Sequence, residues 1–319
     1  MQTSVVTGGA GFIGSHLCEY LLGKGERVIA VDNLGSGSEN NLKGALKNDR
    51  FKFIRHDMRE PLKIGESVDF VYNLASRASP VDFDQYPVEI MMTNSIGTYN
   101  AIDLALEHNA RFLMASTSES YGDPEVSPQP ETYWGRVNPV GPRSCYDESK
   151  RFSEALTMNF IWHHGLDGRI IRIFNTYGPR MRLDDGRVVP NFVTQALEGK
   201  PLTVYGDGSQ TRSFCYVSDL VRGIYLMMQS PVKGEVVNLG NPNEMTVLDF
   251  ARTIIQKTGS SSPIDYRPLP VNDPLQRRPD ITKAKQLLGW EPEVSLDEGL
   301  KNTITWFSRN MSEIKEKLS

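Results

Sequence analysis

Tyr146 and Lys150 lie four positions apart, in a stretch whose pattern predicts a helix over 146–163. Residues at this spacing share one face of a helix, so the phenol and the ammonium group could act together on one proton. An ordinary tyrosine has a pKa of about 10, and a nearby ammonium group and a nicotinamide cation would lower it towards the range of a useful base. Because the Tyr-x-x-x-Lys spacing also arises by coincidence on protein surfaces, its meaning depends on the rest of the chain.

A second group of candidate catalytic residues follows a strand predicted over 111–116. Thr117 and Ser118 come at the end of this strand, where either hydroxyl could hydrogen-bond the substrate hydroxyl that Tyr146 would deprotonate. Glu119 follows, where its carboxylate could face the substrate. Alternatively, it could be an acid at a helix start that satisfies local N–H groups.

Residues 7–14 form a glycine-rich turn between a strand predicted over 4–7 and a helix predicted over 13–22. The turn satisfies both the G-x-G-x-x-G and the G-x-x-G-x-x-G spacing. Glycine lets the backbone approach a pyrophosphate, and the helix N-terminus offers free N–H groups. A glycine triplet alone could be only a tight turn, but here the strand, the helix and a later acid accompany it. The predicted cofactor-binding residues of this turn are Gly8, Gly11, Phe12, Ile13 and Gly14.

Asp32 ends the second predicted strand and could accept hydrogen bonds from the hydroxyls of an adenosine ribose. A carboxylate at this position repels the 2′-phosphate of NADP, and no Lys or Arg occurs from 33 to 38. We therefore expect NAD as the cofactor, with Asn33 as a further binding residue. Asp57 follows the third predicted strand and is either a ligand of the adenine amino group or a solvated loop acid.

Short apolar runs alternate with helical stretches through the first half of the chain. This alternation predicts parallel strands joined by right-handed crossovers, which is a doubly wound, Rossmann-type α/β sheet. The expected strands are 4–7, 27–32, 51–56, 70–75, 111–116 and 168–174, and the expected helices are 13–22, 88–108 and 146–163.

After residue 175 Pro and Gly become frequent, which is typical of short elements joined by loops. We expect a dinucleotide-binding domain over 1–175, with a further piece at about 213–240 whose end returns to the large sheet as a strand. Residues 176–212 and 241–319 are expected to form a smaller substrate-binding lobe, with the ligand cleft between the two.

Composition limits the classes of partner. The chain has 319 residues and a net charge of −4, with 35 basic and 39 acidic residues, so nothing favours a nucleic acid or a membrane surface. Its 3 cysteines are far apart and suit neither a disulfide framework nor a metal site. We therefore expect no metal and a cytoplasmic, reducing setting.

Several long stretches carry a family pattern. Residues 115–124 include Thr117-Ser118-Glu119, and residues 142–151 include Tyr146 and Lys150. The others are 133–139, 172–181, 185–189, 201–208, 210–214 and 277–284. Together these stretches resemble the extended short-chain dehydrogenases, and within that class the UDP-glucuronate decarboxylases. The resemblance covers the whole chain and implies bound NAD, a UDP-sugar substrate and a homodimer that pairs through the helices near 94–108 and 146–163.

The resemblance also implies a redox-neutral reaction. Tyr146 takes the proton of the sugar 4-hydroxyl while C4 gives a hydride to NAD, the resulting 4-keto acid loses carbon dioxide, and the hydride returns to give UDP-xylose. Glu119 would repel the substrate carboxylate or relay a proton to C5, and Arg277 would hold that carboxylate or the diphosphate. The implied substrate-binding residues are Asn175, Val189, Thr203, Tyr205, Arg212 and Arg277.

The chain departs from the family pattern at two positions. Arg77 stands where a proline is expected after the fourth strand, and Pro190 stands where the decarboxylases usually have Ser. We expect Arg77 to lie near the sugar, where an added cation could bind a carboxylate or mark a shifted substrate.

Three alternatives to decarboxylation remain. A 4-epimerase needs only the Tyr and the Lys and would not require Glu119. A 4,6-dehydratase typically carries Asp-Glu after the Thr, whereas this chain has Ser118-Glu119. A catalytically silent NAD sensor could keep the glycine turn, but it would not need both Tyr146 and Lys150.

Overall fold

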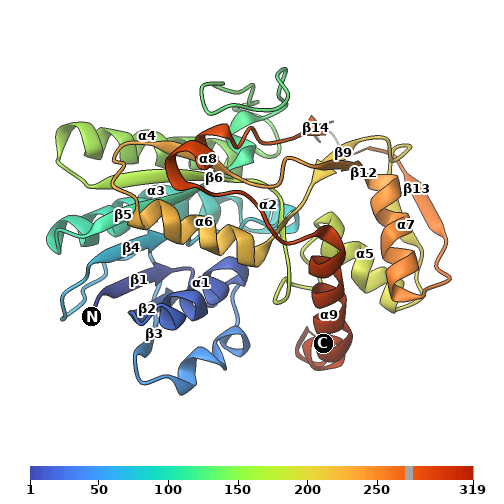
Figure 1. Ribbon diagram of the computed structural model, residues 1–319, viewed down its shortest axis with the longest axis horizontal. Coiled ribbons are helices and arrows are strands. Elements are labelled where there is room, and N and C mark those ends of the chain that lie inside the picture. Colours follow the sequence, from blue (N-terminus) through green and yellow to red (C-terminus); the bar gives the residue numbers. More distant parts are fainter. Residues whose placement is uncertain (270–275, 319) are drawn as a thin grey trace.

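The computed structural model describes residues 1–269 and 276–318. Its centre is a parallel seven-stranded sheet with the strand order β11-β6-β5-β4-β1-β2-β3 (Figure 1). The strands are β1 (Thr3–Thr7), β2 (Arg27–Asp32), β3 (Phe51–Arg55), β4 (Phe70–Asn73), β5 (Arg111–Thr117), β6 (Gly168–Ile173) and β11 (Val236–Leu239). The order reverses between β1 and β4, and this switch point opens a crevice at the carboxyl ends of the strands, where ligands bind in such sheets. The predicted doubly wound sheet is confirmed.

Helices cover both faces of the sheet (Figure 1). One face carries α1 (Phe12–Gly23) and α6 (Val217–Gln229), and the other carries α3 (Pro87–Glu107) and α4 (Ser144–His163). Successive strand residues face opposite sides. Val6 accordingly packs with the first helix pair and Val5 with the second.

A smaller lobe lies beside the carboxyl end of the sheet (Figure 1). Its helices are α5 (Val188–Leu197), α7 (Val247–Thr258) and α9 (Leu296–Leu318), and its strands are β8 (Leu202–Tyr205), β9 (Thr211–Ser213), β12 (Glu244–Thr246), β13 (Ile264–Arg267) and β14 (Gln276–Arg277). Phe192, Phe214, Phe250 and Phe307 are buried in its separate core. The short strands β7 (Thr176–Tyr177) and β10 (Cys215–Tyr216) pair between the two lobes.

The packing of α8 (Thr282–Leu288) differs from the expected grouping of 241–319. Ala284 of this helix and the following Trp290 are buried in the same core as α1 and α6. The indole N–H of Trp290 also donates to the carbonyl oxygen of Asp219 in α6, at 2.9 Å. The chain therefore returns to the larger lobe before it forms α9.

None of the helices in the described ranges is both long enough and apolar enough to cross a membrane.

Candidate active site

A cleft of about 1300 Å³ lies at the carboxyl ends of the sheet strands and extends to the smaller lobe. All the site residues predicted from the sequence line it. They are Gly8, Gly11, Phe12, Ile13, Gly14, Asp32, Asn33, Asp57, Arg77, Thr117, Ser118, Glu119, Tyr146, Lys150, Asn175, Val189, Thr203, Tyr205, Arg212 and Arg277. The fold thus brings together residues that are up to 269 positions apart (277 − 8).

The glycine turn forms one wall of this cleft. Gly8 has a φ of +68°, which favours glycine. A β-carbon on Gly14 would lie only 2.1 Å from the carbonyl oxygen of Gly8, so the tight entry into α1 requires glycine there as well. No side chain caps the N-terminus of α1 at Gly11. The N–H groups of this end can therefore face a pyrophosphate, so the residues present fit a dinucleotide.

Asp32 is fixed by backbone donors of two loops. The N–H of Ala10 donates to Oδ2 at 3.0 Å, and the N–H of Leu34 donates to Oδ1 at 2.7 Å. Burial raises the pKa of Asp32, while these hydrogen bonds oppose the rise. The carboxylate therefore holds the glycine turn against the loop after β2, at the place where it would also meet a ribose.

Asp57 belongs to a small polar group on the same side of the cleft. The side-chain amide of Asn33 donates to Asp57 at 3.0 Å, and the guanidinium of Arg59 lies 2.7 Å from the carboxylate. The hydrogen bond from Arg59 is the largest cause of a lowered pKa of Asp57. An adenine amino group would thus meet a fully ionised carboxylate.

Tyr146 and Lys150 project from one face of α4 towards the end of β5. The Lys150 ammonium donates to the carbonyl oxygen of Ala115 at 2.9 Å and lies 6.0 Å from the centre of the Tyr146 ring. Burial lowers the pKa of Lys150 to about 8. Burial also raises the pKa of Tyr146 to about 12, despite a hydrogen bond with Thr117 and the nearby charge of Arg187. The groups of the protein alone therefore keep the Tyr146 phenol protonated. The sequence predicted a lowered pKa of Tyr146 for a site that also holds a nicotinamide cation.

Glu119 lies between two cations in the buried part of the cleft. Arg143 donates to its Oε2 at 2.6 Å, and Arg277 pairs with its Oε1. Burial opposes ionisation, but the charges of Arg277 and Arg143 outweigh it and lower the pKa of Glu119 to about 2. Arg277 also donates to the carbonyl oxygen of Gly122 at 2.9 Å, and only 4% of its side chain is exposed. Glu119 is thus a permanent carboxylate at neutral pH.

Sequence reasoning missed three residues that contact or influence these groups. Phe83, from the short helix α2 (Pro80–Gln85), stacks on the Tyr146 ring with centroids 5.1 Å apart. Arg143 immediately precedes α4, and its place in the family stretch 142–151 was the sequence signal for it. Arg187 lines the cleft, and its Nη2 donates to Asp185 at 2.7 Å.

The predicted substrate residues come mostly from the smaller lobe. Thr203 is held by Gln195, whose amide donates to the Thr203 hydroxyl at 3.0 Å. Tyr205 is 40% exposed, so its ring is accessible for stacking. The remaining members are Asn175 after β6, Val189 in the first turn of α5, and Arg212 on β9.

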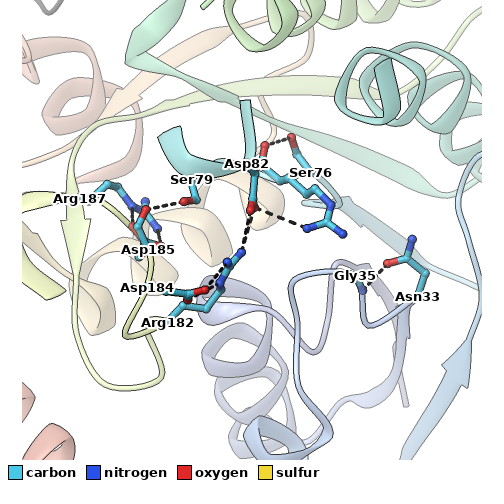
Figure 2. Close-up of polar contacts among 10 residues, drawn as sticks. Asn33, Gly35, Ser76, Ser79, Asp82, Arg182, Asp184, Asp185 and Arg187 are labelled. Carbon is cyan, nitrogen blue, oxygen red and sulfur yellow. Dashed lines mark hydrogen bonds and ion pairs between the residues drawn. The ribbon is translucent and has the colours of Figure 1, made fainter. Parts of the chain in front are cut away.

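The two departures from the family pattern lie in different surroundings. Pro190 occupies the first turn of α5, where backbone N–H groups have no partner within the helix, so proline is tolerated. Arg77 lies against the loop after β2, because a β-carbon on Gly35 would be 2.9 Å from its Nη2. Figure 2 shows this neighbourhood, with the loop of Asn33 and Gly35 on one side and Asp82 on the other. The sequence predicted Arg77 beside the sugar, and in the structure its guanidinium lies in the cleft lining next to the loop that follows Asp32.

The fold and this arrangement of glycine turn, Tyr, Lys and Thr define an extended short-chain dehydrogenase. The profile of the family described as GDP-mannose 4,6 dehydratase matches residues 5–303. UDP-glucuronic acid decarboxylase 1 of Danio rerio is 52% identical over 307 residues, which cover 96% of this chain and 73% of that protein. The chain belongs to this dehydratase-type family and, within it, to the family of the UDP-glucuronic acid decarboxylases.

Solved structures agree with this family at the level of the whole fold. An epimerase from Methanothermobacter thermautotrophicus is 30% identical with a TM-score of 0.92, covering 99% of this chain and 94% of that one. UDP-glucuronic acid 4-epimerase from Bacillus cereus, solved with UDP-glucuronic acid and NAD, is 30% identical with a TM-score of 0.86. That match covers 97% of this chain and 99% of the epimerase.

We predict that Asp32→Ala narrows the preference for NAD over NADP by roughly tenfold, because it removes the charge that repels a 2′-phosphate. The affinities of both dinucleotides, measured by calorimetry, test this. Asp32→Asn is the matched control, since it keeps an acceptor for the backbone donors but loses the charge. It should shift the preference similarly with a smaller loss of thermal stability. Equal affinity of the unaltered protein for NAD and NADP would contradict the assignment.

Proposed function

We propose that this chain is a carboxy-lyase that converts UDP-glucuronate to UDP-xylose and carbon dioxide, with tightly bound NAD. The observation that carries the proposal is the ionised Glu119, held by Arg277 and Arg143 within electrostatic reach of the Tyr146 phenol. The 52% identity to a UDP-glucuronic acid decarboxylase supports the same reaction. An epimerase would need the Tyr and the Lys but would have no use for this charged cluster.

The turn of Gly8, Gly11 and Gly14 and the carboxylate of Asp32 would hold the dinucleotide. A dinucleotide held there would supply reversible hydride transfer at C4 of the sugar, so the overall reaction would consume no oxidant. The residues Asn175, Val189, Thr203, Tyr205 and Arg212, which line the opposite part of the cleft, would bind the UDP-sugar.

Tyr146 and Thr117 would handle the proton of the sugar 4-hydroxyl. Burial opposes the phenolate, so added positive charge is needed before Tyr146 can accept a proton. The Lys150 ammonium and the Arg187 guanidinium supply part of that charge from the protein. Once it has taken the proton, the buried phenol holds it firmly and can donate a hydrogen bond to the sugar O4.

Glu119 would act on the carboxylate of the 4-keto sugar. Its low pKa makes it a poor proton donor at neutral pH, which favours charge repulsion over a proton relay to C5. Loss of carbon dioxide breaks the C5–C6 bond, and the electron pair moves into the C4 carbonyl to form an enolate. Negative charge thus leaves the neighbourhood of Glu119 and moves towards the donors Tyr146 and Thr117. A proton then adds at C5 before C4 is reduced.

The proposal extends to assembly and compartment. Large apolar side chains are exposed on α3 and α4, namely Met91, Met92, Ile96, Tyr99, Phe152 and Trp162. An exposed apolar surface of this kind would be buried if two copies paired through α3 and α4, which supports a homodimer. The cysteines Cys18, Cys145 and Cys215 are buried free thiols, which supports a reducing, cytoplasmic location.

The purified protein should convert UDP-glucuronate to a UDP-pentose with one equivalent of carbon dioxide and little net NADH, because the hydride taken from C4 is returned. Mass spectrometry and NMR of the product test this, with UDP-galacturonate and UDP-glucose as comparison substrates. A UDP-hexuronate that keeps all its carbons would instead identify an epimerase. Accumulated NADH with a 4-keto pentose would show release before the final reduction.

Tyr146→Phe should reduce turnover by roughly 10²- to 10⁴-fold, the usual contribution of general acid–base catalysis. The ring, and with it the stacking on Phe83, remains, so UDP and NAD should bind normally. Steady-state rates and calorimetry on the same preparation measure both properties. An unchanged turnover number would remove Tyr146 from the reaction.

Glu119→Gln should slow carbon dioxide release by at least about tenfold in a single turnover, because the amide keeps the shape but loses the charge. UDP affinity should change little. The variant also leaves Arg277 and Arg143 without their shared anion, so the melting temperature should fall. Glu131→Gln is the control, since Glu131 is a half-buried carboxyl outside the cleft lining. Normal decarboxylation by Glu119→Gln at a lowered melting temperature would make Glu119 purely structural.

A further inference from the structure

Arg77 is a largely buried cation on the cofactor side of the cleft. It follows β4 by four residues, and only 17% of its side chain is exposed. Its guanidinium stacks 3.9 Å above the centre of the Tyr86 ring. It also pairs with the carboxylate of Asp82 at 3.7 Å, which is longer than a hydrogen bond. These two contacts fix the guanidinium in place without occupying its N–H groups.

The neighbouring arginines are bound differently. Arg182 donates to both oxygens of Asp82, at 3.1 and 2.9 Å, and also to Asp184 at 3.0 Å (Figure 2). Arg187 has a two-point contact with Asp185. By contrast, within residues 1–269 and 276–318, no side-chain N–H of Arg77 has a hydrogen-bond acceptor. Because Arg77 lines the cleft, these donors are free to bind the acceptor atoms of a ligand there.

The segment around Arg77 crosses the predicted path of the dinucleotide. At one end, a β-carbon on Gly8 would lie 3.0 Å from Cα of Ala75, which places this segment against the pyrophosphate turn. At the other end, the Arg77 guanidinium reaches Gly35, three residues beyond Asp32. Residues 75–77 therefore extend from the turn that would hold the phosphates to the loop beside the ribose site.

We propose that Arg77 is a further dinucleotide-binding residue, which donates to phosphate oxygens of bound NAD and holds the cofactor in the cleft. Phosphate suits a planar guanidinium with several free donors. Asp82 and Tyr86 orient the Arg77 guanidinium. The carboxylate of Asp82 accepts its hydrogen bonds from Arg182 and not from Arg77. The inference deepens the proposed function at its cofactor site, and it depends only on NAD binding, not on the sugar reaction.

The test is the release of bound NAD from Arg77→Met, a variant that keeps an apolar side chain against Tyr86. Bound NAD is chased with excess NADH, and binding of NADH is followed by its fluorescence, without any sugar nucleotide. We expect release to be at least about tenfold faster than in the unaltered protein, because charged hydrogen bonds to phosphate are lost. The UDP affinity, measured by calorimetry, should stay within about twofold. Because no turnover is measured, the result is independent of whether the chain decarboxylates UDP-glucuronate.

Two further variants separate binding from folding. Arg27→Gln removes one positive charge at the far end of β2, outside the cleft lining, and should leave NAD release unchanged. Asp82→Asn keeps Arg77 but removes the carboxylate that orients it, so it should accelerate NAD release clearly less than Arg77→Met does. Equal acceleration by Arg77→Met and Asp82→Asn would overturn the proposal, because it would show that both residues only support α2. Unchanged NAD release in Arg77→Met, with or without weaker UDP binding, would also overturn it.

Discussion

The Glu119 carboxylate joins three segments that are far apart in the chain: the turn after β5, the start of α4 and strand β14. A buried carboxylate without cations would be protonated, and buried guanidinium groups without an anion would be costly. The three groups are therefore stable only when assembled together. Their assembly fixes the first turn of α4 against the end of β5, which places Tyr146 beside Thr117. The same contact ties the smaller lobe to the sheet, so the position of Tyr146 and the joining of the two lobes depend on one ion cluster.

The two ends of the cleft use different physical means. The shape of the dinucleotide end depends on glycine residues, since a single β-carbon on Gly14 would collide with the backbone of Gly8. The sugar end is shaped by buried charged and polar groups, where Glu119 stays ionised and Tyr146 stays protonated. Backbone shape selects a ligand class, whereas buried charge can favour one reaction over another on the same scaffold.

Much of the fold and of the site composition could be predicted, because local patterns determine both. Alternating strands and helices predicted the sheet, and the motif residues all line the cleft. Long-range contacts left no local signal. The stacking of Phe83 on Tyr146 depends on where α2 packs, and the direction of Arg77 depends on Tyr86 and Asp82. The raised pKa of Tyr146 follows from burial, which spacing along a helix cannot reveal.

The return of the chain to the sheet at α8 has a mechanical consequence. The backbone leaves the larger lobe after β6, comes back at α6, leaves again after β11 and comes back at α8 before it forms α9. Two bodies joined by several segments of chain can move apart only if all of those segments bend together, whereas two bodies joined by one linker need only one bend. Several crossings of the chain thus hold the two lobes together as one frame. The several connections also protect against proteolysis, since cleavage of one connecting segment leaves the others to hold the two lobes together.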